Sequence, residues 1–150
     1  MGRARPRPPM ILSRLPTLIF GFLVLSAVLL AALVIPGAQA DRFPGATPER
    51  AVPVLWLLVG ANFAFAFLLF ALSRTAATLA NWRWRVVACL AALPILLMGL
   101  AMTDGAVAYW GHGAPMRPAA VALFGSAASN VVAGILATLF GLLRPKPPAA

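Results

Sequence analysis

Four long apolar stretches dominate the pattern of polar and apolar positions along the chain. They cover residues 15–35, 51–73, 86–109 and 118–143, and Asp104 is the one charged residue inside them. About 20 helical residues, at about 1.5 Å each, cross the roughly 30 Å of hydrocarbon in a bilayer. None of the stretches shows the two-residue alternation of a membrane β-barrel strand. The pattern therefore predicts an all-α integral membrane protein, a small bundle of four transmembrane helices within residues 15–143.

The segments outside these stretches are short. Pro36 and Gly37 follow the first stretch, and a glycine-rich turn at residues 111–113 follows the third. The tails, residues 1–14 and 144–150, are rich in proline and basic residues, a composition typical of disordered chain ends. We therefore expect two cytoplasmic tails and no folded domain outside the membrane.

Composition supports the membrane assignment. The chain has 150 residues, of which 62% are apolar and 10% are charged. A typical soluble domain is about half apolar and about a quarter charged. A soluble fold with the composition of this chain would lack the polar surface needed to cover its core. Disordered chains are excluded as well, because they combine high charge with low hydrophobicity. An integral membrane protein is the class that remains.

The basic residues predict an orientation. The chain carries 12 basic and 3 acidic residues, a net charge of +9. Basic residues in short loops stay on the cytoplasmic side. Nine of them fall on one side of the four spans: Arg3, Arg5, Arg7, Arg14, Arg74, Arg83, Arg85, Arg144 and Lys146. The other side has three basic and three acidic residues: Arg42, Arg50, Arg117, Asp41, Glu49 and Asp104. We therefore expect both termini in the cytoplasm.

The same distribution bears on partners and location. The arginines flank the spans and do not cover one folded face, so we expect no nucleic acid partner. Anionic lipid headgroups at the inner face are the expected partners, at about 1 kcal/mol per basic residue. The preference for arginine over lysine, 11 to 1, and the 31 alanines are typical of GC-rich coding sequences. We expect a multi-pass protein of a bacterial cytoplasmic (inner) membrane.

The first stretch has two interpretations. Residues 38–40 read Ala-Gln-Ala, a signal-peptidase cleavage pattern, with Pro36 upstream. The apolar stretch before them is about 21 residues, longer than the 7 to 15 of a typical signal peptide and long enough to span. An uncleaved membrane anchor is the favoured prediction. A mature protein that begins at Asp41 is the alternative.

The fourth stretch has two different faces. With 100° per residue, one face carries small and polar side chains: Ala122, Ser126, Ser129, Asn130, Ala133, Gly134, Ala137 and Gly141. The other face carries large apolar side chains: Phe124, Val131, Ile135, Leu139 and Leu142. A face of small residues lets another helix approach closely, so Ser126 and Gly134 are predicted packing positions. A ligand or ion role for this face is the less favoured alternative.

Asparagines occupy the middle of two stretches. Asn62 shares a face with Leu55, Leu58, Ala66, Leu69 and Ser73, and Asn130 lies near the centre of the fourth stretch. We expect their amides to bond to each other or to nearby backbone carbonyls. Such a bond contributes on the order of 1 kcal/mol in a membrane.

Asp104 is the most unusual residue. It lies about 27 Å along the third helix, near the outer interface and away from the bilayer centre. One interpretation is an ion pair with Arg50, Arg117 or His112, or a hydrated carboxylate. The other is a proton or cation site. Both interpretations remain open from the sequence.

Reactive residues are scarce. Cys89 and His112 are each the only residue of their type. We find no Ser/His/Asp set, phosphate-binding glycine loop or cluster of metal ligands, and so expect no catalytic, cofactor or metal site. The favoured function is a non-enzymatic accessory or assembly subunit acting through helix–helix contacts, within a larger complex or with copies of itself. A small homo-oligomeric transporter or channel using Asp104 is the alternative. A membrane enzyme acting on lipid or quinone has the weakest support.

Overall fold

The computed structural model describes residues 10–39, 48–74 and 82–143, and every element in these ranges is helical. Four helices are long and apolar enough to cross a membrane: Arg14–Gln39, Glu49–Ser73, Arg85–Gly111 and Ala114–Leu142. The prediction of an all-α membrane protein with four spanning helices is confirmed. Residues 1–9 and 144–150 of the expected tails, together with Ala40, Asp41 and Arg42, lie outside the described residues.

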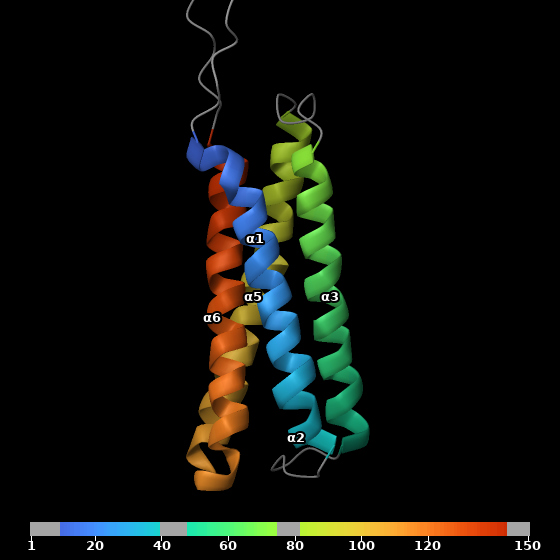
Figure 1. Ribbon diagram of the computed structural model, residues 1–150, viewed down its shortest axis with the longest axis vertical. Helices are drawn as coiled ribbons and strands as arrows, with labels where there is room; N and C mark the ends of the chain where they lie inside the picture. The colour runs from blue at the N-terminus through green and yellow to red at the C-terminus, as the bar shows by residue number, and fades with distance from the viewer. Residues whose placement is uncertain (1–9, 40–47, 75–81, 144–150) are drawn as a thin grey trace, which may run out of the picture.

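The helices form an up-down-up-down bundle (Figure 1). The elements are α1 Met10–Leu29, η1 Leu30–Val34, α2 Ile35–Gln39, α3 Pro48–Arg74, α5 Trp82–Gly111, η2 Ala114–Met116 and α6 Arg117–Leu142. At one end of the bundle α1 begins and α6 ends; we call it the terminal end. The other end, where α2 ends, α3 begins and α5 is followed by α6, is the hairpin end.

The first span continues past the point where we expected it to stop. Pro36 was predicted to follow its last turn, but the helix continues to Gln39 through the wide π-turn η1, closed by a bond from the Ile35 N–H to the Leu30 carbonyl. A proline ring crowds the carbonyl four residues earlier and lacks an N–H. A π-turn widens the helix at that place, and so accommodates Pro36 without a break. Ala38, part of the candidate cleavage pattern, is buried on α2.

The glycine-rich turn ends α5 as the sequence suggested. Gly113 has φ 96°, in the left-handed region that glycine adopts without strain. The Met116 N–H then bonds to the Gly113 carbonyl at 3.1 Å and starts the turn that leads into α6. The connection between α5 and α6 is therefore short, which keeps these two helices side by side.

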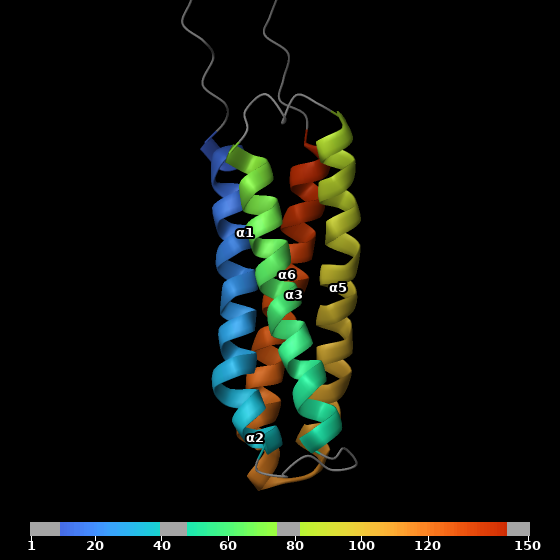
Figure 2. The same cartoon turned by 90° about the vertical axis from the view of Figure 1, so that its right-hand side faces the viewer.

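The contacts between helices are uneven around the bundle. Helix α6 contacts α5 most extensively and then α1, and α1 also contacts α3, whereas α3 and α5 touch little. Figure 2 shows α3 and α5 beside each other on the side that faces the viewer. The ring of helices is therefore open between α3 and α5.

Small residues explain the close approach of α5 and α6. A Cβ added at Gly99 would lie 2.9 Å from Val131 Cγ2 and 3.1 Å from the Ala127 carbonyl oxygen. One added at Gly134 would lie 2.5 Å from Leu96 Cγ. All eight members of the predicted small-residue face are buried. Val131, expected on the lipid side, lies partly buried against Gly99.

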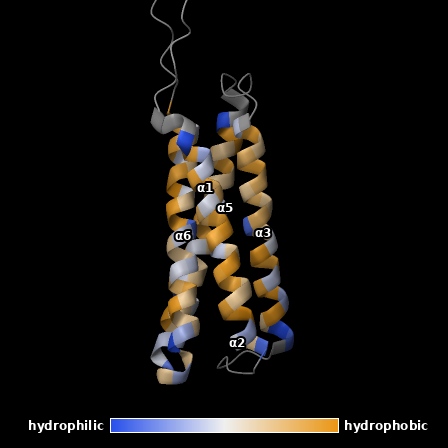
Figure 3. Ribbon diagram, viewed as in Figure 1, coloured by the Kyte–Doolittle hydropathy of each residue, from blue (hydrophilic) through white to orange (hydrophobic). Residues whose placement is uncertain are grey.

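The buried core has two apolar clusters. The terminal-end cluster is built around Ile19, Leu23, Ala66, Leu69, Ala88, Ala92, Ile95, Ala133 and Ala137. The hairpin-end cluster is built around Leu30, Val34, Leu55, Val59, Met102, Ala106, Ala122, Leu123 and Ala127. Large apolar side chains are also exposed on all four long helices. The ribbon is hydrophobic along most of its length, and most of its strongly hydrophilic residues lie toward the two ends (Figure 3). That distribution fits a helix bundle surrounded by lipid.

Candidate functional site

A layer of buried polar side chains separates the two apolar clusters. Its members are Ser26 on α1, Asn62 on α3, and Ser126, Ser129 and Asn130 on α6. On α1 and α3 the polar residue lies between residues of the two clusters, and on α6 Ser129 and Asn130 do so as well, whereas Ser126 directly precedes Ala127 of the hairpin-end cluster. We call this the polar layer. It lies near the middle of each span, where polar groups are costly and must find partners within the protein.

Two serines join helices within this layer. The hydroxyl oxygens of Ser26 and Ser126 are 2.6 Å apart, and Ser126 Oγ is also 3.2 Å from the Ser26 carbonyl oxygen and 3.2 Å from Met102 Sδ. When the Ser26 hydroxyl donates to Ser126 Oγ, the Ser126 hydroxyl can donate to the Ser26 carbonyl oxygen or to Met102 Sδ. The group connects α1, α5 and α6. Ser26 was missed from the sequence, although it is the single polar side chain between Thr17 and Gln39.

The two asparagines do not bond to each other. Asn62 Nδ2 donates to the Leu58 carbonyl of its own helix at 2.9 Å, which is the backbone alternative expected above. Its Oδ1 atom, and both Nδ2 and Oδ1 of Asn130, are buried without a hydrogen-bond partner. Leaving such a group unpaired costs about 1–3 kcal/mol. The polar layer therefore retains three unpaired amide atoms.

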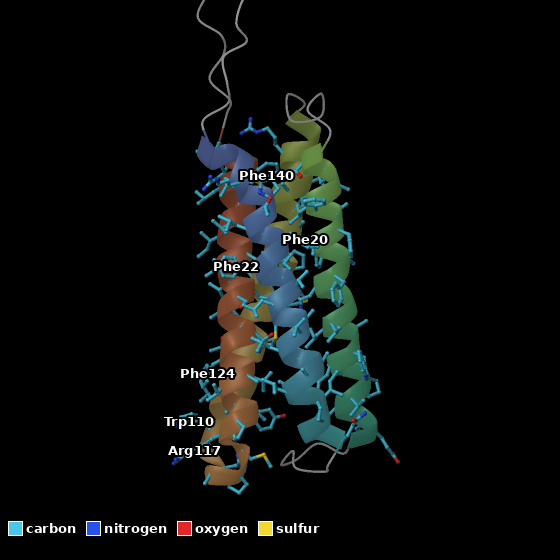
Figure 4. All side chains as sticks on the ribbon, viewed as in Figure 1. Phe20, Phe22, Trp110, Arg117, Phe124 and Phe140 are labelled. Atoms are coloured by element: carbon cyan, nitrogen blue, oxygen red, sulfur yellow. The ribbon has the colours of Figure 1, made fainter. Side chains whose placement is uncertain are left out.

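Asp104 is placed apart from the polar layer. It is exposed on the outward side of α5, and within the described part of the chain it forms no ion pair. The Arg117 guanidinium carbon lies 5.6 Å from the centre of the Trp110 ring (Figure 4), and His112 Nδ1 donates to the Ala108 carbonyl at 2.6 Å. Of the interpretations raised from the sequence, the ion pair with Arg50, Arg117 or His112 is not formed within the described residues, and the hydrated carboxylate and the proton or cation site are not tested.

The depth of Asp104 makes this exposure costly. Trp110 lies near the end of α5, and tryptophan rings favour the headgroup level. Asp104 lies six residues earlier, about 9 Å deeper. Among the described residues it is the one charged side chain more than a turn inside a candidate span. Its carboxylate thus faces the margin of the apolar region with no partner from the described chain.

A stripe of large side chains surrounds Asp104. The exposed residues that recur every three or four positions along this side of α5 are Val86, Leu90, Leu93, Leu97, Leu100, Asp104 and Val107. We call this set the α5 stripe. The equivalent outward positions of α6 are all apolar: Val121, Val132, Ile135, Leu139 and Leu142. The α5 stripe is therefore the outward face that carries a charge within the membrane.

Comparisons with protein-family models, with curated proteins and with solved structures find no match. Within the described ranges, no group of three or more His, Cys, Asp and Glu side chains is close enough to hold a metal ion. Cys89 packs against Gly141 in the contact between α5 and α6. Two features remain for function: the α5 stripe with Asp104, and the polar layer.

Proposed function

We propose that the protein is a non-enzymatic accessory or assembly subunit that joins a larger membrane complex through the α5 stripe. The observation that carries this proposal is the exposure of Asp104 on the outward side of α5, without a partner in the described chain. The partner is a transmembrane helix with a lysine, arginine or histidine at the depth of Asp104.

The chemistry of the stripe supports a helix as the partner. An aspartate at the centre of a span costs about 2.5–3.5 kcal/mol, and less toward the interface. A cation on a neighbouring helix offsets this cost, which hydrocarbon cannot do. Leucines spaced three and four residues apart pack well against a second helix, and one polar position among them sets register and partner choice.

The small-residue face of α6 is not the docking surface. Its members are buried against α5 and α1 inside the bundle. The sequence suggested that helix–helix contacts through this face support an accessory role, but the protein uses the face for its own folding. Of the exposed apolar faces, the α5 stripe is the one that carries a charge well inside a candidate span of the described chain, and it is therefore the proposed docking surface.

The proposal includes an orientation and a location. Arg14 and Arg85 lie at the terminal end and Glu49, Arg50 and Arg117 at the hairpin end. The tails of the sequence are basic as well, so the positive-inside rule supports an orientation in which the terminal end faces the cytoplasm. The proposed location is a bacterial inner membrane. Asp104 then faces the outer half of the membrane, and anionic headgroups accompany the inner arginines.

The unpaired amides of Asn62 and Asn130 favour a second candidate, a homo-oligomeric transporter or channel. Buried amides near mid-membrane are typical of pathways for polar solutes. Asp104, however, lies on the outward surface and the amides lie inside the bundle. A symmetric pairing of two α5 stripes would also bring two Asp104 carboxylates together, which like-charge repulsion disfavours.

Quantitative co-purification from native membranes tests the proposal. The tagged protein, Asp104→Asn and the charge-conserving control Asp104→Glu are isolated in mild detergent at equal expression. We expect a stoichiometric partner whose recovery falls about tenfold with Asp104→Asn and is retained with Asp104→Glu, as for loss of one charge-assisted bond. An unchanged recovery with Asp104→Asn, or a pure oligomer of this chain, would overturn the accessory role.

A further inference from the structure

The gap in the ring of helices contains a groove. It lies between α3 and α5 in the hairpin-end half of the bundle and has a cavity volume of about 400 Å³. Arg50 and Tyr109 lie at its outer end, Leu58 and Ala101 at its inner end, and Leu123 of α6 also lines it. We call it the α3–α5 groove. Its volume falls within the range of roughly 300–1,000 Å³ that ligand sites occupy.

The groove exists because small residues line it. Ala51 on α3, and Ala101 and Gly105 on α5, leave space that larger side chains would fill. A Cβ added at Gly105 would meet nothing within 4 Å, whereas one added at Gly99, six residues earlier, would collide with α6. The same helix is therefore tightly packed on its α6 side and open on its α3 side.

The length of the groove matches one leaflet. Along α3 it runs from Arg50 to Leu58, and along α5 from Tyr109 to Ala101, and the two end residues are eight positions apart in each case. Eight residues of helix extend about 12 Å. One leaflet contributes about half of the roughly 30 Å of hydrocarbon. The groove thus begins at the headgroup level and ends near the polar layer, where Leu58 accepts the Asn62 bond.

A single cation lies at the mouth. Arg50 is the one charged residue that lines the groove, and it is exposed in the first turn of α3. Glu49 precedes it and Asp104 lies between two groove residues, but neither carboxylate lines the groove. A cation above an apolar slot of one leaflet's depth matches a molecule with an anionic head and an apolar chain.

We propose that the α3–α5 groove holds one acyl chain of a glycerophospholipid, with the lipid phosphate bound by Arg50. Arginine presents several N–H donors in a geometry that suits phosphate oxygens. Below Arg50 and Tyr109 the groove is lined by apolar residues, which remove the acyl chain from contact with bulk lipid. The lipid closes the ring of helices where α3 and α5 touch little. This site is independent of the docking role of the α5 stripe.

Native mass spectrometry of the full chain, released from micelles that contain phosphatidylglycerol or a phosphate-free galactolipid, tests the site. Gly105→Leu fills the groove and Gly60→Leu is its matched control, since Gly60 is a second helical glycine whose added Cβ would meet nothing within 4 Å and does not line the groove. Arg50→Gln removes the cation, and Arg117→Gln is the matched control at the same end of the bundle.

We expect Gly105→Leu to lower the retained fraction of both lipids by about tenfold. Arg50→Gln should lower phosphatidylglycerol retention by about tenfold and leave galactolipid retention unchanged. Both controls should match the unaltered protein. Equal retention in Gly105→Leu and Gly60→Leu, with circular dichroism showing both folded, would overturn the groove as the lipid site. An equal loss of both lipids in Arg50→Gln would overturn the phosphate contact.

Discussion

Helix α5 has two long faces that are both apolar, but neighbouring helices cover one of them and leave the other exposed. The inward face is rich in small residues, Ala88, Ala92, Gly99 and Ala106, with Ile95 and Met102 among them, and is closed by its neighbours. The outward α5 stripe is made of leucines with Asp104 among them, and nothing in the described chain covers it. Hydropathy alone does not separate the two faces.

Side-chain size explains the difference. Between lipid-surrounded helices there is little hydrophobic driving force, so close approach of backbones and van der Waals packing decide which faces meet. Glycine and alanine permit that approach, and leucine holds a neighbour farther away. The small face thus marks the contact within this chain, and the exposed leucine face with Asp104 is the surface that we propose for contact with another chain.

The largest expected effect comes from enlarging the inward face. Gly99→Leu places four carbons where even a Cβ would lie within 3.2 Å of backbone atoms of Ala127 and Val131. We expect a loss of about 3 kcal/mol in the free energy of unfolding, the upper range for overpacking. An SDS unfolding titration in mixed micelles measures it.

Gly60→Leu is the control for this substitution, because an added Cβ at Gly60 meets nothing within 4 Å. It should unfold at the same SDS fraction as the unaltered protein. Equal destabilisation by Gly99→Leu and Gly60→Leu would mean that the close contact between α5 and α6 does not hold the bundle together.

A smaller loss in the free energy of unfolding is expected from a substitution in the polar layer, where Ser126 contacts the inward face of α5. Ser126→Ala removes the hydroxyl that lies 2.6 Å from Ser26 Oγ and 3.2 Å from Met102 Sδ. We expect the free energy of unfolding to fall by about 1 kcal/mol, the typical value of an interhelical bond in a membrane. The same titration applies, with Ser129→Ala as control, since Ser129 bonds within its own helix to the Gly125 carbonyl. No difference between the two variants would contradict a bridging role for Ser126.

Arg85 connects the start of α5 to the end of α6. Its substitution should lower the free energy of unfolding by less than Ser126→Ala does. Its Nη2 donates to the Leu142 carbonyl at 2.7 Å, at an exposed helix end where a cation also faces the negative end of the helix dipole. Arg85→Gln should lower the free energy of unfolding by about 0.5 kcal/mol. Added salt should shrink the difference between the two proteins, because screening weakens exposed charges. A difference that grows with salt would exclude this contribution.

The smallest effect is expected on the outward face. Leu97→Ala and Asp104→Asn change side chains that no other described helix covers, so the isolated protein should unfold within about 0.5 kcal/mol of the unaltered one. Thermal unfolding followed by fluorescence-detected size exclusion is a suitable measurement. A large loss from either variant would show that the stripe is part of the bundle's own packing.

Much of this organisation could be predicted from the sequence, because long apolar stretches and the face of small residues on α6 are local patterns. The continuation of the first helix through Pro36 could not be predicted, since the π-turn that accommodates this proline depends on how the first span packs. Nor could the sequence decide between the two partners expected for Asn62, or show that Asn130 and Asp104 have no side-chain partner in the described chain. Helical periodicity places a residue on a face, but which faces meet depends on all four helices together.

Site-specific photo-cross-linking in native membranes tests the docking role of α5 most directly. A photo-activatable residue replaces Leu100 in the α5 stripe and, separately, Ile135 on the outward face of α6; the two side chains are 61% and 50% exposed. We predict that position 100 cross-links to one partner helix, at a peptide with a basic residue, and that Asp104→Asn abolishes the adduct. Position 135 should give only lipid adducts. Equal protein adducts from both positions, or an adduct from position 100 that survives Asp104→Asn, would contradict the account.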